Sequence, residues 1–246
     1  MKQPNKILNA FSSKFGQIAV LIDPDKVKDE VYLKALVEKA LYAGVDYFFV
    51  GGSTVSSSDF NFVIQKLKSF TDIPVVIFPG NSQQVSGEAD AILYLSLISG
   101  RNPEYLIGQH VQSAEEIIAL DLEVIPTGYI LIDGGKQSSV AYVSQTTPIP
   151  RDKESIAYKT ALAGNLLGKS ILFFDAGSGA KHSVPLSLLQ KVTSSIQLPT
   201  IVGGGIRTIE SIQQFTEAKA NVIVIGNHIE ESIDFLLDIK NYKLQS

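Results

Sequence analysis

The residues best suited to chemistry are two glycine-containing turns near the end of this 246-residue chain. Gly203-Gly204-Gly205 follows a β-branched run at 200–202, and Gly226-Asn227 follows a similar run at 222–225. Glycine lets backbone amides approach a ligand closely, and a helix expected from Thr208 adds unpaired N–H groups and the positive end of its dipole. Each turn alone is better explained as an ordinary tight turn. As a pair they favour a phosphate site of the kind formed late in many TIM barrels.

A carboxylate and a hydroxyl follow the first two apolar runs of the chain. Asp23 comes directly after the first run and Ser53 comes shortly after the second. Mg²⁺ typically binds one or two protein oxygens and keeps water and substrate phosphate, so this pair predicts a metal site. An Asp-Pro turn or helix cap explains Asp23 equally well. Asp25 is an alternative ligand but is expected to be solvated, and Lys26 is expected to be a surface charge.

A second carboxylate, Asp175, ends the apolar run at 170–174. Partial desolvation there would suit a base or a group that grips hydroxyls. The alternative is a loop aspartate that caps the next turn. Gly177-Ser178-Gly179 behind it offers a third amide-rich contact for phosphate. The histidines lack the spacing of a zinc site and are expected at the surface or in caps: His110, His182 and His228.

The elements that must position these residues alternate between strand-like and helix-like patterns. Apolar runs typical of strands lie at 18–22, 47–50, 75–78, 91–97, 124–132, 170–175, 200–202 and 222–226. The pattern predicts one α/β domain over residues 1–246, a (β/α)8 TIM barrel. In such a barrel the carboxyl ends of all strands lie on one face, which brings together Asp23, Ser53, Asn81, Asp133, Asp175, Gly204 and Asn227.

Three segments depart from a regular barrel. Residues 82–90 are polar and few, so the third helix is expected to be degenerate or missing. Pro126 and Gly128 interrupt the fifth strand and predict a bent or edge-like stretch. The polar segment 133–151 is expected to form a mobile loop over the site. Residues 1–16 are expected to form a short helix under the barrel.

Composition excludes some classes of protein. A net charge of −4 disfavours nucleic acid as a partner, and the absence of cysteine rules out disulfides and thiolate nucleophiles. Neither a signal peptide nor a membrane-spanning run is recognised, so we expect a cytoplasmic protein with at most peripheral membrane contact. An apolar face over 104–119 makes a homo-oligomer, a dimer or larger, the expected state.

Six motifs in order resemble geranylgeranylglyceryl phosphate synthase and its bacterial relatives. They are LIDPDK (21–26), VGGS (50–53), FPGN (78–81), FFDAGSGA (173–180), VGGGI (202–206) and VIGN (224–227). The resemblance spans nearly the whole chain and includes LSLISGRNPEYLIGQHV (95–111). The longer-chain group shared by archaea and some bacteria is the most similar subset.

The resemblance implies a TIM barrel without a regular third helix and a prenyl transfer from a polyprenyl diphosphate to the 3-hydroxyl of sn-glycerol 1-phosphate. It implies that Asp23 and Ser53 bind Mg²⁺ and that Asp175 is catalytic. The residues that it implies for binding glycerol 1-phosphate are Phe173, Phe174, Asp175, Ala176, Gly177, Ser178, Gly179, Gly204, Gly205, Gly226 and Asn227. Many relatives have Tyr-Leu-Glu in place of Phe173-Phe174-Asp175, and this difference leaves the identity of the catalytic base open.

Two other functions are compatible with the residues. A phosphosugar isomerase or aldolase-like barrel would use the same phosphate site, with Asp23 and Asp175 as an acid and base pair. A non-catalytic phosphate-binding barrel is the third possibility. The prenyl chain length and the residues that floor its groove are left open by the sequence.

Overall fold

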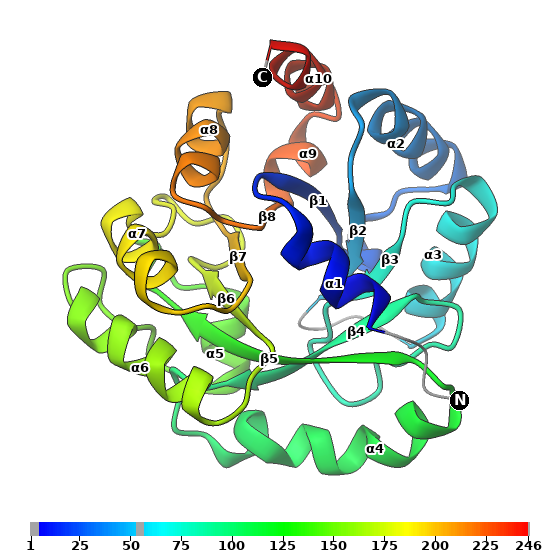
Figure 1. Ribbon diagram of the computed structural model, residues 1–246. Coiled ribbons are helices and arrows are strands. Elements are labelled where there is room, and N and C mark those ends of the chain that lie inside the picture. Colours follow the sequence, from blue (N-terminus) through cyan, green and yellow to red (C-terminus); the bar gives the residue numbers. More distant parts are fainter. Residues whose placement is uncertain (1–4, 53–56, 246) are drawn as a thin grey trace.

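The structure is a computed structural model that describes residues 5–52 and 57–245, and its strands close into one parallel barrel (Figure 1). The strands follow one another around the ring in chain order: β1 (Gln17–Ile22), β2 (Tyr47–Val50), β3 (Val75–Ile77), β4 (Ala91–Leu97), β5 (Glu123–Leu131), β6 (Ile171–Asp175), β7 (Thr200–Gly203) and β8 (Val222–Ile225). Because β1 pairs with both β2 and β8, the sheet has no edge. The predicted α/β barrel is confirmed.

Helices surround the barrel and follow most of the strands (Figure 1). They are α1 (Lys6–Ser13), α2 (Glu30–Ala43), α3 (Ser57–Phe70), α4 (Gln109–Ala119), α5 (Ser139–Ser144), α6 (Glu154–Leu166), α7 (Leu186–Ser195), α8 (Ile209–Glu217), α9 (Asn227–Glu231) and α10 (Phe235–Gln245). A 3₁₀ turn (Pro24–Lys26) precedes α2, and a π-helical turn (Glu104–Gly108) precedes α4. Residues 78–90 join β3 to β4 without a helix, so the predicted gap is confirmed.

Strand alternation divides the core into two layers. In β6, Leu172 and Phe174 face outward and pack with the apolar sides of the helices. Phe173, between them, faces the barrel axis and packs on Tyr129 and Phe78. Since successive side chains of a strand point to opposite faces, only every second residue of a strand can reach the interior and its open end.

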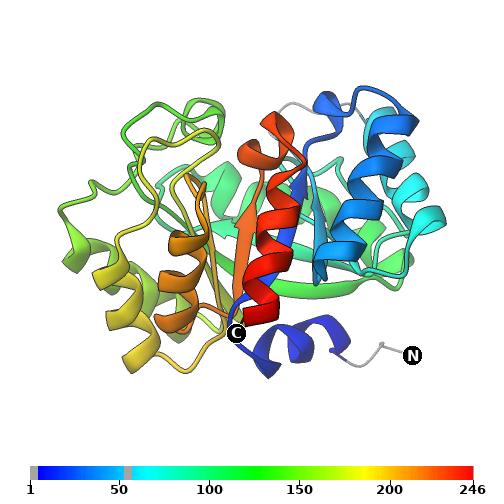
Figure 2. The ribbon, with the colours of Figure 1, turned by 90° about the horizontal axis from the view of Figure 1, so that it is seen from above.

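Helix α1 closes the amino-terminal end of the barrel, as expected for residues 1–16. The carboxylate of the buried Glu123 accepts hydrogen bonds from Ile7 N and Leu8 N at the first turn of α1. The Phe11 ring packs edge to face on Tyr47, with their centroids 4.8 Å apart. Figure 2 shows α1, in dark blue, below the strands. The functional end of the barrel must therefore be the opposite one.

The fifth strand is not edge-like, contrary to the prediction. β5 pairs with β4 and β6, and the carbonyl of Pro126 accepts a hydrogen bond from Ser170 N at 2.7 Å. Gly128 reflects close packing, because a Cβ there would stand 3.1 Å from both Ile98 Cδ1 and Leu172 Cδ2. Closure of the ring gives every strand two neighbours, which a sequence pattern of Pro and Gly does not reveal.

Two surface properties bear on partners. In the described part of the chain, no helix combines the length and the apolar character that a bilayer span requires. The segment 104–119 exposes a row of large apolar side chains, with Ile107, Val111 and Ile118 each more than half exposed. This face agrees with the expected homo-oligomer, which stays a prediction.

Candidate active site

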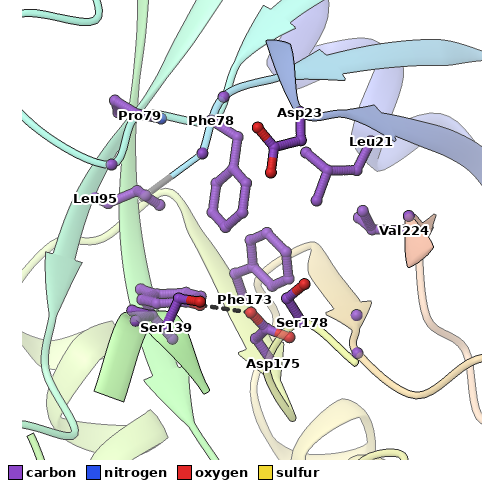
Figure 3. Close-up of a pocket in the computed structure, with 18 of the residues that line it drawn as sticks. Leu21, Asp23, Phe78, Pro79, Leu95, Ser139, Phe173, Asp175, Ser178 and Val224 are labelled. Atoms are coloured by element: carbon purple, nitrogen blue, oxygen red, sulfur yellow. Dashed lines mark hydrogen bonds between the residues drawn. The ribbon is translucent and has the colours of Figure 1, made fainter. Parts of the chain in front are cut away.

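A cavity of about 380 Å³ lies at the carboxyl ends of the strands. Asp23 and Asp175 both line it, on opposite sides of Phe78 and Phe173 (Figure 3). Several other predicted residues line the same cavity: Asn81, Ser178, Gly179, Gly204, Gly205, Gly226 and Asn227. Asp133 does not line it, because its exposed carboxylate turns to the amide of Gly135 at 2.8 Å. Ser53 lies outside the described residues.

Asp23 stands at the junction of β1 and the 3₁₀ turn. Its Oδ1 accepts a hydrogen bond from Asp25 N at 3.2 Å, so the capping role considered for it is present. Its Oδ2 faces Lys26 Nζ at 3.6 Å, and the same ammonium pairs with Glu230 Oε2 at 2.8 Å. Burial alone would lower the pKa of Lys26, but the carboxylates of Glu230 and Asp23 raise it. Lys26 is thus the surface charge that we expected, with its side chain 43% exposed, and it is also a paired cation at the edge of the cavity.

Asp175 is the last residue of β6 and points into the barrel, where it is 8% exposed. Tyr129 OH donates to its Oδ2 at 2.5 Å, and Gly177 N donates to its Oδ1 at 2.8 Å. Burial raises the pKa of Asp175, while these two hydrogen bonds act to lower it. The same pair, with burial, holds the pKa of Tyr129 well above its ordinary value. The predicted desolvation of Asp175 is confirmed.

The turn after β7 has no room for a side chain. Gly204 has a φ of +83°, and a Cβ there would lie 2.7 Å from Asp175 Oδ1 and 2.8 Å from Gly177 N. Gly205 has a φ of +70°, which also favours glycine. The amides of Gly204 and Gly205 make no hydrogen bond with the described residues, so they are available to an anion.

The turn after β6 is tied to the turn after β8. Asn227 Oδ1 accepts from Ser178 Oγ and from Gly179 N, each at 2.8 Å. The amide of Gly177 is occupied by Asp175. Two of the amides expected to bind phosphate are therefore occupied: that of Gly179 joins the two turns, and that of Gly177 holds Asp175. The side chains of Phe174 and Ala176 lie in the outer core layer, so only their backbone can contribute to a site.

Comparisons with known proteins agree with this geometry. The PcrB family model matches residues 14–242. The chain belongs to the PcrB family. A geranylgeranylglyceryl phosphate synthase of Chitinophaga pinensis is 49% identical over 96% of this chain and 94% of its own length. One of Korarchaeum cryptofilum is 41% identical over 92% of each chain.

A solved structure supports the same assignment. The (S)-3-O-geranylgeranylglyceryl phosphate synthase of Thermoplasma acidophilum, in complex with its substrate sn-glycerol-1-phosphate, superposes with a TM-score of 0.89 at 33% identity. The match covers 98% of this chain and 97% of that one. The resemblance recognised from the motifs is confirmed, and PcrB membership favours prenyl transfer over the isomerase and phosphate-binding alternatives.

Tyr129 is a site residue of this PcrB chain that the sequence did not reveal. Phe173 has no phenol, and the adjacent strand supplies one, because β5 pairs Tyr129 with Phe173. The two rings pack edge to face at 5.4 Å, which aims the Tyr129 hydroxyl at Asp175. Only the register between β5 and β6, which are far apart in the sequence and adjacent in the sheet, could have identified Tyr129.

Two histidines also differ from expectation. His110 is buried and lines the cavity, and burial together with Lys169 lowers its pKa. His228 lines the cavity and packs edge to face on Phe235 at 4.5 Å. Both were expected at the surface or in caps. The cavity reaches His110 because no helix fills the space after β3 in the described chain, which leaves the inner side of α4 facing the opening.

Proposed function

We propose that the protein transfers a geranylgeranyl or similar polyprenyl group from its diphosphate to the 3-hydroxyl of sn-glycerol 1-phosphate. The products are an ether-lipid precursor and free diphosphate. One observation carries the proposal: a single cavity joins glycine turns suited to phosphate with the Asp23 carboxylate across an apolar, aromatic surface. The names of the similar proteins support the same reaction.

The acceptor would lie on the side of β6, β7 and β8. The free amides of Gly204 and Gly205 can donate to its phosphate, and Phe173 and Gly226 line the cavity beside them. Asn227, Ser178 and Gly179 hold the adjoining turns in register. Such a site, in which backbone amides are the donors, suits one small anion and leaves the larger diphosphate to the other side.

The reaction breaks the allylic C–O bond, and its electron pair leaves with the diphosphate. The acceptor oxygen forms the new C–O bond and releases its proton. Positive charge builds on the prenyl carbon before the new bond is complete, so a strong base is not needed early. Asp175 would orient the hydroxyl and take, or help disperse, its proton, and its own position is maintained by Tyr129 and Gly177.

The Asp23 side of the cavity fits Mg²⁺ carried by a diphosphate. The described residues contain no group of three or more acidic, histidine or cysteine ligands that could hold a metal alone. One half-buried carboxylate beside substrate phosphate is a donor set that Mg²⁺ accepts. Asp23, with Ser53 as the predicted second ligand, would hold the ion. Bound there, Mg²⁺ would offset charge on the departing diphosphate.

The prenyl chain would lie on the apolar side of the cavity. Residues of the connection between β3 and β4, of β4 and of the segment before α4 line it: Phe78, Pro79, Val85, Ile92, Tyr94, Leu95, Leu97 and Tyr105.

The direct test supplies the purified protein with sn-glycerol 1-phosphate and labelled geranylgeranyl diphosphate, with Mg²⁺ or with a chelator. We expect label in an organic-soluble phosphate ester only when the acceptor, the donor and Mg²⁺ are all present. Omission of the acceptor separates transfer from simple hydrolysis of the donor. Absence of the ester under all conditions would contradict the proposed function, and ester formation in chelator would contradict the role of Mg²⁺.

A further inference from the structure

The segment after β5 packs directly on the turn after β6. The carbonyl of Gly134 accepts hydrogen bonds from Lys181 N at 2.9 Å and from His182 N at 3.1 Å. A Cβ on Gly134 would stand 2.4 Å from the carbonyl oxygen of Ala176, and one on Gly177 would stand 2.6 Å from Ser138 Cβ. Because the two backbones touch at these glycines, the residues between 134 and 138 have a defined position above the turn.

Lys136 is carried by this segment and lies beside Gly179, which lines the acceptor side of the cavity. Its Nζ lies 3.5 Å from the point that a Cβ on Gly179 would occupy. Lys136 is exposed, and among the described residues it has neither an ion-pair nor a hydrogen-bond partner. Its ammonium group is therefore free to bind an anion beside the turn 177–179.

Among the described lysines and arginines, only Lys26 and Arg207 line the cavity, and Arg207, two residues after Gly205, is exposed. Gly204 and Gly205 provide amide dipoles, and Asn227 is neutral, while Asp175 places a buried carboxylate next to them. A phosphate brought to this side meets a like charge in a partly desolvated setting, which costs free energy unless a cation is near. Lys26 is engaged by Glu230 and Asp23 on the other side of the opening.

We propose that Lys136 binds the phosphate of the acceptor and closes over it from the β5 side. This inference rests on the proposed function for the identity of the acceptor. The ammonium group adds a charge-assisted contact that a backbone site cannot provide, and it selects a phosphorylated acceptor over a neutral polyol. Lys136 is thus a binding and specificity residue for the acceptor, with no role in the chemical step.

The test compares Lys136→Met, which removes the charge, with Lys136→Arg, which keeps it. Lys159→Met, on the exposed side of α6, is the control for net charge. Isothermal titration with sn-glycerol 1-phosphate should show binding weakened about tenfold in Lys136→Met. Lys136→Arg should stay within about threefold of the wild type, and Lys159→Met should match it. In Lys136→Met the KM for the acceptor should rise while kcat and the KM for the prenyl diphosphate stay unchanged.

Other results would overturn the inference. Wild-type binding in Lys136→Met is one, and equal losses in the Met and Arg variants are another. If Arg207→Met weakens binding and Lys136→Met does not, the cation is Arg207, which also lines the cavity. Wild-type protein that binds the acceptor but transfers no prenyl group contradicts the proposed function alone. Wild-type protein that does not bind the acceptor contradicts both.

Discussion

The two sides of the cavity are built in different ways. On the acceptor side, the turns after β6, β7 and β8 contact one another through backbone and short side chains, and Asp175 is buried among them. On the Asp23 side, half-exposed side chains face one another, and the closest ion pair joins Lys26 to Glu230 at 2.8 Å. One side is fixed by packing of the backbone, and the other is held by charged groups in contact with solvent.

This difference indicates how each side would bind its substrate. Amides held by tight turns are already oriented, so a small anion binds there without reorganisation of the loops. A single carboxylate such as Asp23 is only part of a metal site, and the rest of the coordination has to come with the substrate. Mutations on the two sides should therefore differ in which kinetic constant they change.

The largest effect is expected from Asp23→Asn. The amide cannot supply negative charge to Mg²⁺, so turnover should fall on the order of a hundredfold or more. The melting temperature should change little, because Asp23 is only half-buried and its nearest cation is 3.6 Å away. The measurement is the rate as a function of Mg²⁺ concentration. A near-normal rate at ordinary Mg²⁺ would remove Asp23 from the metal site.

Asp175→Asn should have the next largest effect, on kcat and not on binding of the donor. Loss of a positioned carboxylate should lower kcat about a hundredfold. Asp175→Glu, which keeps a carboxylate at this position, should keep substantial activity. The measurement is kcat of both variants at saturating substrates across pH. If Asp175→Asn equals the wild type throughout, the carboxylate has no chemical role and Asp175 only caps the following turn.

The pH dependence of Asp175 follows from its raised pKa. If the carboxylate acts ionised, kcat should fall as pH drops through this raised pKa, at a higher pH than for an ordinary aspartate. For stability the sign is opposite, because the folded state binds the proton more tightly than the unfolded state. The stabilising contribution is present below the ordinary pKa of aspartate and is lost as pH rises through the raised one. The free energy of unfolding of the wild type, relative to Asp175→Asn, should decrease over that interval.

Gly204→Val should act on the acceptor alone. The new side chain would occupy space within 2.8 Å of Asp175 and the following amides, so the KM for glycerol 1-phosphate should rise about tenfold more than that for the prenyl diphosphate. Gly168→Val is a matched control, since Gly168 also has a positive φ but no atom within 4 Å of its Cβ position. Equal effects on both substrates would contradict the assignment of this turn.

The smallest effect is expected from Tyr129→Phe. Removal of the hydroxyl deletes one of the two hydrogen bonds that lower the pKa of Asp175. The acid limb of the kcat profile should move to higher pH, with a severalfold loss of kcat. An unchanged profile would show that Tyr129 does not tune the carboxylate. Phe49→Leu, at a buried aromatic in the same inner layer, is the control for loss of packing.

The sequence determined the barrel, the missing helix after β3 and the convergence of Asp23, Asp175 and the glycine turns. These follow from local patterns, because apolar runs alternate with helical periodicity and every parallel strand of a closed barrel ends on the same face. The positive φ of Gly204 and Gly205 likewise agrees with the type of residue found there.

Only the tertiary structure decided which side chains meet. The register of β5 against β6 sets Tyr129 beside Phe173 and aims its phenol at Asp175, and strand alternation turns Phe174 away from the cavity. Loop packing brings Lys136 over Gly179, and the open space after β3 exposes His110 to the cavity. The physical reason is that these contacts join residues far apart in the chain. Their geometry depends on closure of the whole barrel, and no local pattern carries that information.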